Sequence, residues 1–184
     1  MNTKNNRRAQ NTQQKIKAIL LEKLADKHLH QVTVQEICHA AKINRTTFYI
    51  HFDNLADVMQ TIEAEMQEGI NRLFLDPESD VYKPLTDQSL EQLIAYIHEN
   101  ASFYRVLLND LNSLELLDRE LAASWEREIE PVFRKKGEWT EIELRYRFEY
   151  FNSGFRGIIR RWLNERCPES PAELARVIKN VVQV

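Results

Sequence analysis

A short stretch near the N-terminus carries side chains that can bind the edges and backbone of a DNA duplex. An arginine fork such as that of Arg45 pairs with guanine, and the hydroxyl and methyl groups of Thr46 suit a base edge or a thymine methyl. Lys42, Tyr49 and His51 are of the types that hold phosphate oxygens, which position a protein without reading sequence. The alternative is an exposed helix face with no ligand, and the pattern around these residues favours DNA contact.

The elements that must position these side chains begin with a cap. Thr33 is a good N-cap, and Glu36 three residues later completes a capping box, which predicts a helix over residues 34–41. The same threonine hydroxyl can cap the helix, touch a phosphate or do both. A turn over residues 42–44 follows, and Asn44 caps the next helix.

That next helix covers residues 45–52, and it should turn Phe48 and Phe52, at i and i+4, into a small core. A first helix over residues 12–27 precedes them and completes a three-helix helix-turn-helix. In this motif the third helix enters the major groove with its N-terminus first, so Arg45 and Thr46 would stand nearest the bases.

Charge is distributed unevenly along the chain. Residues 1–52 carry nine lysines and arginines against three acids, a net charge of +6, while the remainder carries −9. A basic segment on an acidic body is what a phosphate-facing module attached to a different kind of domain should look like. Lys4, Arg7 and Arg8 are expected to form a disordered tail, and an arm in the minor groove is the alternative.

Residues 33–52, TVQEICHAAKINRTTFYIHF, resemble the TetR/AcrR family of transcription regulators, and the resemblance covers about residues 12–60. The positions that match the family's pattern are Ile37, Ala41, Ile43, Asn44, Thr47, Phe48, Tyr49, His51 and Phe52. Two positions depart from it. Lys42 replaces the usual turn glycine, where a left-handed backbone costs about 1 kcal/mol more, and Leu55 replaces a basic residue.

The resemblance implies an all-α fold with a helix-turn-helix domain over residues 1–54 and an effector and dimerisation domain over residues 55–184. It also implies a homodimer on a pseudo-palindromic operator, repression, and relief by a small-molecule effector. An activator, or a DNA-tethered factor that acts on another protein, are the alternatives. The DNA contacts expected are Thr33, Lys42, Asn44, Arg45, Thr46, Thr47, Tyr49 and His51.

Helical periodicity continues through the C-terminal part. The expected helices cover residues 55–73, 87–100, 103–108, 114–135 and 140–166, and a last helix begins at Pro171; a loop containing residues 76–80 and Pro84 interrupts them. Small residues in the middle of the long helix permit close helix approach, and we expect a dimer interface there that includes the last helix; local packing is the alternative. The interface residues expected are Ser153, Gly154, Gly157, Ile178 and Val182.

An effector pocket, if present, should draw on aromatic side chains of the same domain, although most aromatics at helical spacing are simply core. Those expected to line it are Tyr96, Phe103, Tyr104, Trp125, Tyr146, Tyr150 and Phe155.

Other classes of function have no foothold in the sequence. Cys38 and the nearby histidines lack the spacing of a zinc site, so Cys38 is expected in the core and we expect no metal. The carboxylates are scattered, and four isolated glycines build no phosphate loop, so we expect neither catalysis nor a cofactor. No run of 18 apolar residues and no secretory signal is present, and with two widely separated cysteines this predicts a cytoplasmic protein.

Overall fold

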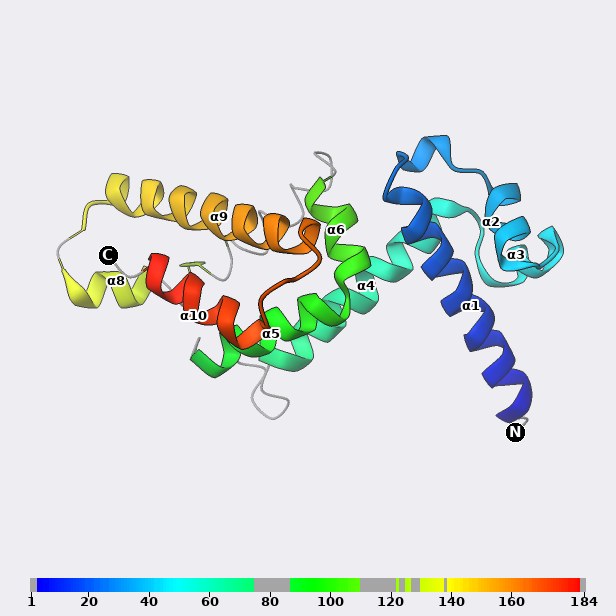
Figure 1. Cartoon of the computed structure of the whole chain (residues 1–184), viewed down its shortest axis with the longest axis horizontal. Coiled ribbons are helices and arrows are strands. Elements are labelled where there is room, and N and C mark those ends of the chain that lie inside the picture. Colours follow the sequence, from blue (N-terminus) through cyan, green and yellow to red (C-terminus); the bar gives the residue numbers. More distant parts are fainter. Residues whose placement is uncertain are drawn as a thin grey trace. The chain divides into compact units, whose positions relative to one another are not determined.

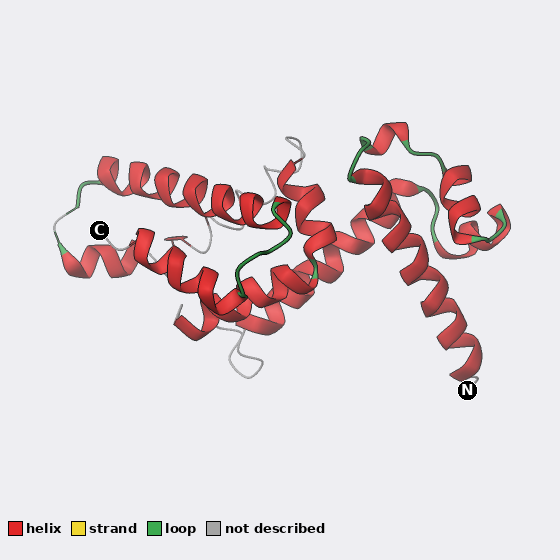
Figure 2. Ribbon diagram, viewed as in Figure 1, coloured by secondary structure: helices red, strands yellow, loops and turns green. Residues whose placement is uncertain are grey.

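The computed structural model describes residues 3–74, 87–109, 122, 125–126, 130–137 and 139–182. The regular elements within these ranges are helices, as the all-α prediction requires (Figure 2). The chain divides into two compact units, Met1–Glu68 and Gly69–Val184. The boundary expected between residues 54 and 55 stays a prediction, because helix α4 begins at Leu55 and continues past the division between the units.

The first helix, α1, is longer at its N-terminal end than the sequence suggested. It runs over Thr3–Leu24, so the predicted start near Thr12 is wrong, and so is the prediction of a disordered tail at Arg7 and Arg8. Polar asparagines, glutamines and basic residues gave this extension no apolar stripe to recognise. Thr12 does not cap the helix; its hydroxyl donates to the Arg8 carbonyl oxygen at 2.9 Å, one turn back in the same helix.

The remaining elements of the first unit follow the predicted order. A 3₁₀ turn, η1 (Leu29–Gln31), separates α1 from α2 (Val34–Ala41), which is followed by α3 (Arg45–His51) and α4 (Leu55–Phe74) (Figure 1). Helix α1 packs against α2, and α2 packs against α3. The largest fully buried side chains of this unit are Phe48, Ile16, Leu20, Ile37 and Val58.

A partly buried ion pair joins α1 to α4 within the first unit. The Lys17 ammonium lies 2.6 Å from both carboxylate oxygens of Glu65, and Lys17 is only 5% exposed. The Glu65 side chain is 43% exposed, so water still reaches one side of the pair. A lysine this deeply buried depends on its anionic partner, because an isolated buried charge is costly.

The second unit contains α5 (Asp87–Glu99), α6 (Ala101–Asn109), α8 (Glu130–Lys136), α9 (Glu141–Asn164) and α10 (Pro171–Val182). Helix α10 packs against α5 and α9, and α6 packs against α9 and α5 (Figure 1). The Arg105 guanidinium on α6 donates to the Leu163 carbonyl oxygen near the end of α9, at 3.0 Å for Nη2. Ile94, Ile159 and Leu163 are fully buried in this unit.

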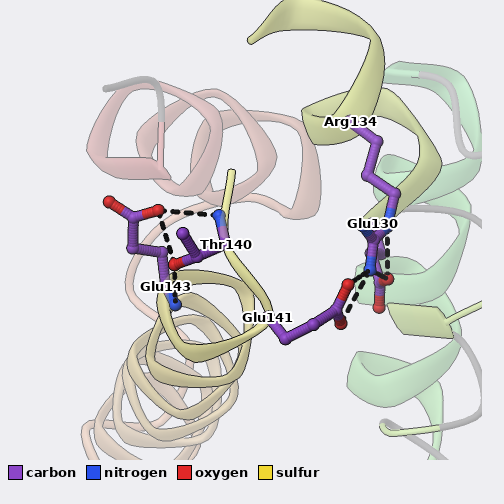
Figure 3. A network of polar contacts seen from close by, with 5 residues as sticks. All are labelled: Glu130, Arg134, Thr140, Glu141 and Glu143. Atoms are coloured by element: carbon purple, nitrogen blue, oxygen red, sulfur yellow. Dashed lines mark hydrogen bonds and ion pairs between the residues drawn. The ribbon is translucent and has the colours of Figure 1, made fainter. Parts of the chain in front are cut away.

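Caps and charges fix where α9 begins. Thr140 and Glu143 form a reciprocal capping box, in which the Thr140 N–H donates to the Glu143 carboxylate at 2.8 Å (Figure 3). The same figure shows Arg134 of α8 between two carboxylates, 2.7 Å from Glu130 and 2.8 Å from Glu141. These contacts tie α8 to the first residue of α9.

Other predicted boundaries are close to the observed ones. The last helix begins at Pro171 as predicted, after a capping box between Ser170 and Glu173. The short helix predicted near residues 103–108 is present as α6, which begins at Ala101 and ends at Asn109. The predicted loop over residues 76–80 with Pro84, and most of the predicted helix over residues 114–135, lie outside the described residues.

The ion pair between α1 and α4 gives a stability prediction. Removing its acid by Glu65→Ala should lower the free energy of unfolding by about 2 kcal/mol, because Lys17 is left buried without its anion. The matched control is Glu165→Ala, which breaks the exposed pair with Arg161 and should cost no more than about 0.5 kcal/mol. Urea denaturation measures both, and equal losses would contradict the structural role of the Lys17–Glu65 pair.

Candidate nucleic-acid interface

The turn between α2 and α3 fixes the direction in which α3 leaves the first unit. Lys42 has a left-handed backbone, with φ of 54° and ψ of 47°. Its N–H donates to the His39 carbonyl oxygen at 3.2 Å, and the Ile43 N–H donates to the Cys38 carbonyl oxygen at 3.0 Å. This is the Schellman pattern of helix termination, which satisfies carbonyl groups at the end of α2. A residue with a Cβ therefore occupies the left-handed position of this turn.

Both predicted N-caps are present. The Asn44 side-chain oxygen accepts from the Thr47 N–H at 2.7 Å and starts α3 immediately after the turn. At the start of α2, the Glu36 N–H donates to the Thr33 hydroxyl at 3.2 Å, and the Thr33 N–H donates to the Glu36 carboxylate at 2.8 Å. The turn between the two helices is bounded by the Schellman end of α2 at Lys42 and by the Asn44 cap of α3, which leaves α3 little freedom to change its angle to α2.

Charge reinforces the cap of α2. The Lys27 ammonium lies 2.7 Å from the Glu36 carboxylate, which also accepts from the Thr33 hydroxyl at 2.9 Å. The bond from Lys27 contributes most, followed by the bonds from the Thr33 backbone and hydroxyl, and together they lower the pKa of Glu36 from 4.5 to about 2. Because the hydroxyl hydrogen of Thr33 is used within the cap, a bond from it to a phosphate would have to replace the one to Glu36.

Helix α3 has one buried and one exposed side. Phe48 is fully buried and Phe52 is 4% exposed, which confirms that these two rings point into the core. Their centroids lie 6.1 Å apart. On the other side of the helix Arg45 and Thr46 are exposed, and Tyr49 is 54% exposed. The core therefore holds α3 by its two phenylalanines and presents the polar residues to solvent.

The predicted contact residues are grouped on the surface of α3 and the turns around it. Thr33, Lys42 and Asn44 are exposed as well, whereas Thr47 and His51 are half-buried. Leu55, where the family places a basic residue, is 8% exposed and belongs to the core, so it offers nothing to a phosphate.

One residue that supports this surface was missed by the sequence reasoning. The Arg45 guanidinium donates from Nη2 to the Gln35 side-chain oxygen at 3.1 Å, so α2 helps to orient the arginine of α3. Gln35 lies one residue into α2, and no signal in the sequence distinguished it from an ordinary exposed glutamine. Cys38 is buried, as expected. Burial raises the pKa of its thiol, and the positive charge of Arg45 opposes this effect.

The aromatic residues proposed for an effector pocket fall into two described groups. In one, Tyr104 on α6 makes edge contacts with Tyr96 and Phe103, and burial, then repulsion from Tyr96, raises the pKa of Tyr104. Gly69 leaves room for Tyr96, since a Cβ there would lie 1.9 Å from the tyrosine hydroxyl. In the other group, Trp125 contacts phenylalanines of α8 and α9: Phe133, Phe148 and Phe151.

Two of the proposed pocket residues are not in either group. Tyr146 and Tyr150 are 65% and 69% exposed on α9, so the structure does not place them in the interior of the second unit. Their sequence spacing gave no indication of this, because aromatic residues occur on both faces of α9. Phe155 does lie on the inner side, where its ring stacks on Phe151 with centroids 6.2 Å apart.

The expected interface residues also divide. Ser153 and Gly154 are exposed, and a Cβ added at Gly154 or Gly157 would meet nothing within 4 Å among the described residues. Close packing inside the chain therefore does not explain these two glycines. Ile178 is only 2% exposed and faces the core, so it is not available to a partner; the Val182 side chain lies outside the described residues.

Among the described residues, no three histidine, cysteine, aspartate or glutamate side chains gather in a way that could hold a metal ion. The described helices also include none with a stretch long and apolar enough to cross a lipid bilayer.

Comparison with known proteins decides the family. The TetR-type family described as "Transcriptional regulator C-terminal region" matches residues 86–184, more than half of the chain. The chain belongs to the TetR family of transcriptional regulators. This match lies in the C-terminal part, whereas the motif that first suggested the family lies in residues 33–52, so the two ends of the chain point to the same family independently.

Curated relatives of this TetR-family regulator are distant. It is 23% identical over 179 residues to the uncharacterized HTH-type transcriptional regulator YxbF of Bacillus subtilis, and 30% identical over 128 residues to the dhaKLM operon transcriptional activator DhaS of Lactococcus lactis. These alignments cover 91% and 66% of the chain. They span 43% and 63% of the length of the two relatives.

Solved structures share the fold of this regulator. The fatty acid degradation regulator FadR from Bacillus halodurans has a TM-score of 0.64 at 17% identity, covering 93% of this chain and 94% of its own. A TetR regulator from Streptococcus agalactiae has a TM-score of 0.62 at 18% identity, with 98% of each chain covered. The operon activator DhaS has a TM-score of 0.52 at 22% identity, with 93% of each covered.

The left-handed lysine of this TetR-family regulator gives a second prediction. Lys42→Gly should raise the free energy of unfolding by about 1 kcal/mol, because glycine adopts a positive φ without the steric cost that Cβ imposes. Lys42→Ala is the control, since it removes the same charge but keeps a Cβ in the left-handed conformation. Thermal unfolding of the two variants measures the difference, and equal stability would show that the turn stores no strain.

Proposed function

We propose that this regulator binds double-stranded DNA as a dimer, with α3 of each subunit in successive major grooves of a pseudo-palindromic operator. The observation that carries the proposal is the exposed side of α3, where Arg45, Thr46 and Tyr49 project while Phe48 anchors the helix in the core. An arginine near the N-terminal end of a recognition helix suits guanine O6 and N7, and Tyr49 and His51 suit phosphate oxygens.

The net charge supports the same proposal. Residues 1–52 carry +6, and Lys42 and Arg45 lie exposed beside the turn and at the start of α3. Each phosphate that such a group neutralises releases a condensed counterion, so affinity should fall steeply as salt concentration rises. The acidic remainder of the chain would be repelled by DNA, which confines binding to residues 1–52.

Dimerisation is proposed through the outward faces of α9 and α10. On α9, Ile142, Tyr146 and Tyr150 recur every four residues and are 61%, 65% and 69% exposed. The same side continues through Ser153, Gly154 and Gly157, where a partner helix could approach closely. On α10, Val177 and Val181 are 43% and 51% exposed, and they replace the buried Ile178 in the proposed interface. Tyrosine is enriched at such interfaces, so we assign Tyr146 and Tyr150 to this surface instead of a pocket.

Effector control remains part of the proposal because TetR-type regulators typically respond to small molecules. An apolar or aromatic effector would bind among the helices of the second unit that carry the Tyr104 and Trp125 groups. To change the affinity for DNA, this effector must bind more tightly to one spacing of the two α3 helices of the dimer than to another. The sign of regulation depends on where the operator lies relative to the promoter. Repression is the proposed sign; the relative DhaS is named as an activator.

DNA binding is tested with an operator selected from random-sequence duplexes by the purified wild-type protein. Arg45→Ala should weaken binding about 5- to 150-fold and relax preference at one base pair of each half-site. Tyr49→Ala should weaken binding to a similar degree on all sequences, because its partner is a phosphate. Lys135→Ala, which removes an exposed cationic side chain of α8 outside both proposed surfaces, is the matched control and should bind normally.

Failure would be clear in that assay. If the wild-type protein selects no duplex even at low salt, DNA binding is refuted, and an interaction with another protein becomes the better explanation of the exposed side of α3. Loss of affinity in Lys135→Ala equal to that in Arg45→Ala would place the interface elsewhere.

The dimer is tested separately with Gly157→Leu. A Cβ added at Gly157 would meet nothing within 4 Å among the described residues, and leucine favours a helix more than glycine does, so the subunit should remain folded. In the proposed interface the same side chain would hold two helices apart, and sedimentation should show a monomer. Gly157→Ala is the conservative control and should stay dimeric. A Gly157→Leu protein that remains fully dimeric would exclude this face of α9 from the interface.

A further inference from the structure

The most exposed of the large apolar side chains in the described structure lies on α3. Ile50 is 73% exposed, more than any of the surface apolar residues of α9 and α10. It follows Tyr49 and lies one residue before half-buried His51. A branched aliphatic side chain left in water on a helix gains nothing for the fold, and isoleucine is not among the strongest helix formers.

Ile50 belongs to the same side of α3 as the polar residues already described. It lies four residues after Thr46, so the two side chains are neighbours on the helix surface, one turn apart. Side chains of a helix lean toward its N-terminus, which brings Ile50 back toward Thr46 and the end of α3 that Arg45 begins. The fully buried Phe48 faces the opposite way, which excludes Ile50 from the core.

We propose that Ile50 reads a thymine by packing against its C5-methyl group in the major groove, an inference that rests on the proposed binding of DNA through α3. Among the base-pair edges of the major groove, the thymine methyl is the apolar group that an aliphatic side chain can bury. The distance along the axis from Thr46 to Ile50 is about 6 Å. The thymine therefore lies within about two base-pair steps of the contact made by Thr46.

Charge around Ile50 selects DNA over a protein partner as the occupant. Exposed Lys42 and Arg45 lie at the turn and at the first residue of α3, and the segment up to residue 52 carries +6. A protein-docking surface would need a contiguous apolar patch, whereas Ile50 is accompanied on α3 by the exposed polar residues Arg45, Thr46 and Tyr49. Cationic side chains that neutralise phosphates beside one aliphatic side chain suit a groove with a methyl group on its floor.

The test uses the selected operator and replaces each thymine of a half-site, one at a time, with deoxyuridine. This change removes only the methyl group and keeps the base pair. At one thymine position of the half-site, replacement by deoxyuridine should lower the affinity of the wild-type protein about fourfold for each half-site that carries the change. This is the loss expected for one buried methyl group. Ile50→Ala should bind the thymine and uracil operators equally, and Ile50→Val should keep most of the discrimination.

The controls separate this inference from the proposal on which it rests. Ile50→Ala should unfold at the wild-type temperature, because the side chain is 73% exposed. Wild-type binding that is tight but indifferent to every uracil would overturn the thymine contact and leave DNA binding intact. Discrimination that persists in Ile50→Ala would overturn it too, since another residue would then read the methyl group. Absence of wild-type binding to any duplex would overturn both.

Discussion

The left-handed turn at Lys42 is the constraint on which the proposed DNA-binding surface depends. Because Lys42 ends α2 in a Schellman pattern and the Asn44 side chain caps α3 two residues later, the direction of α3 is set at the turn and not by the exposed side chains along the helix. Phe48 and Phe52 then hold the helix against the core. Because the turn and the core fix the orientation of α3, the residues at its exposed positions can differ without changing that orientation. In the proposed function these are the residues that read the DNA sequence.

The two units carry their exposed surfaces for different reasons. In the first unit the exposed side of α3 is polar and positively charged, apart from Ile50, and suits phosphates and base edges. In the second unit the outward face of α9 combines tyrosines with glycines at which an added Cβ would meet nothing within 4 Å among the described residues, which suits another helix. Helix α4 is the element that continues from one unit into the other. Lys17 of α1 forms an ion pair with Glu65 of this helix.

Local chemistry decided how much could be predicted from the sequence. Caps such as Thr33 and Asn44 depend on side chains a few residues apart, so their helices were predicted close to their observed starts. The polar beginning of α1 has no apolar stripe, and its extent was missed. Exposure of Tyr146 and burial of Ile178 depend on which neighbouring helices cover α9 and α10, and contacts between distant segments leave no mark in local spacing. The hydrogen bond from Arg45 to Gln35 likewise joins two different helices, so local spacing in the sequence did not indicate it.

Insertion of α3 into the major groove is tested most directly by methylation interference on the selected operator. Dimethyl sulfate methylates guanine at N7 in the major groove and adenine at N3 in the minor groove, so the two grooves are probed in one experiment. DNA molecules methylated at guanine N7 in either half-site should be missing from the protein-bound fraction. DNA molecules methylated at adenine N3 should remain in that fraction. Depletion confined to adenine N3, or no depletion at any base, would contradict recognition through α3.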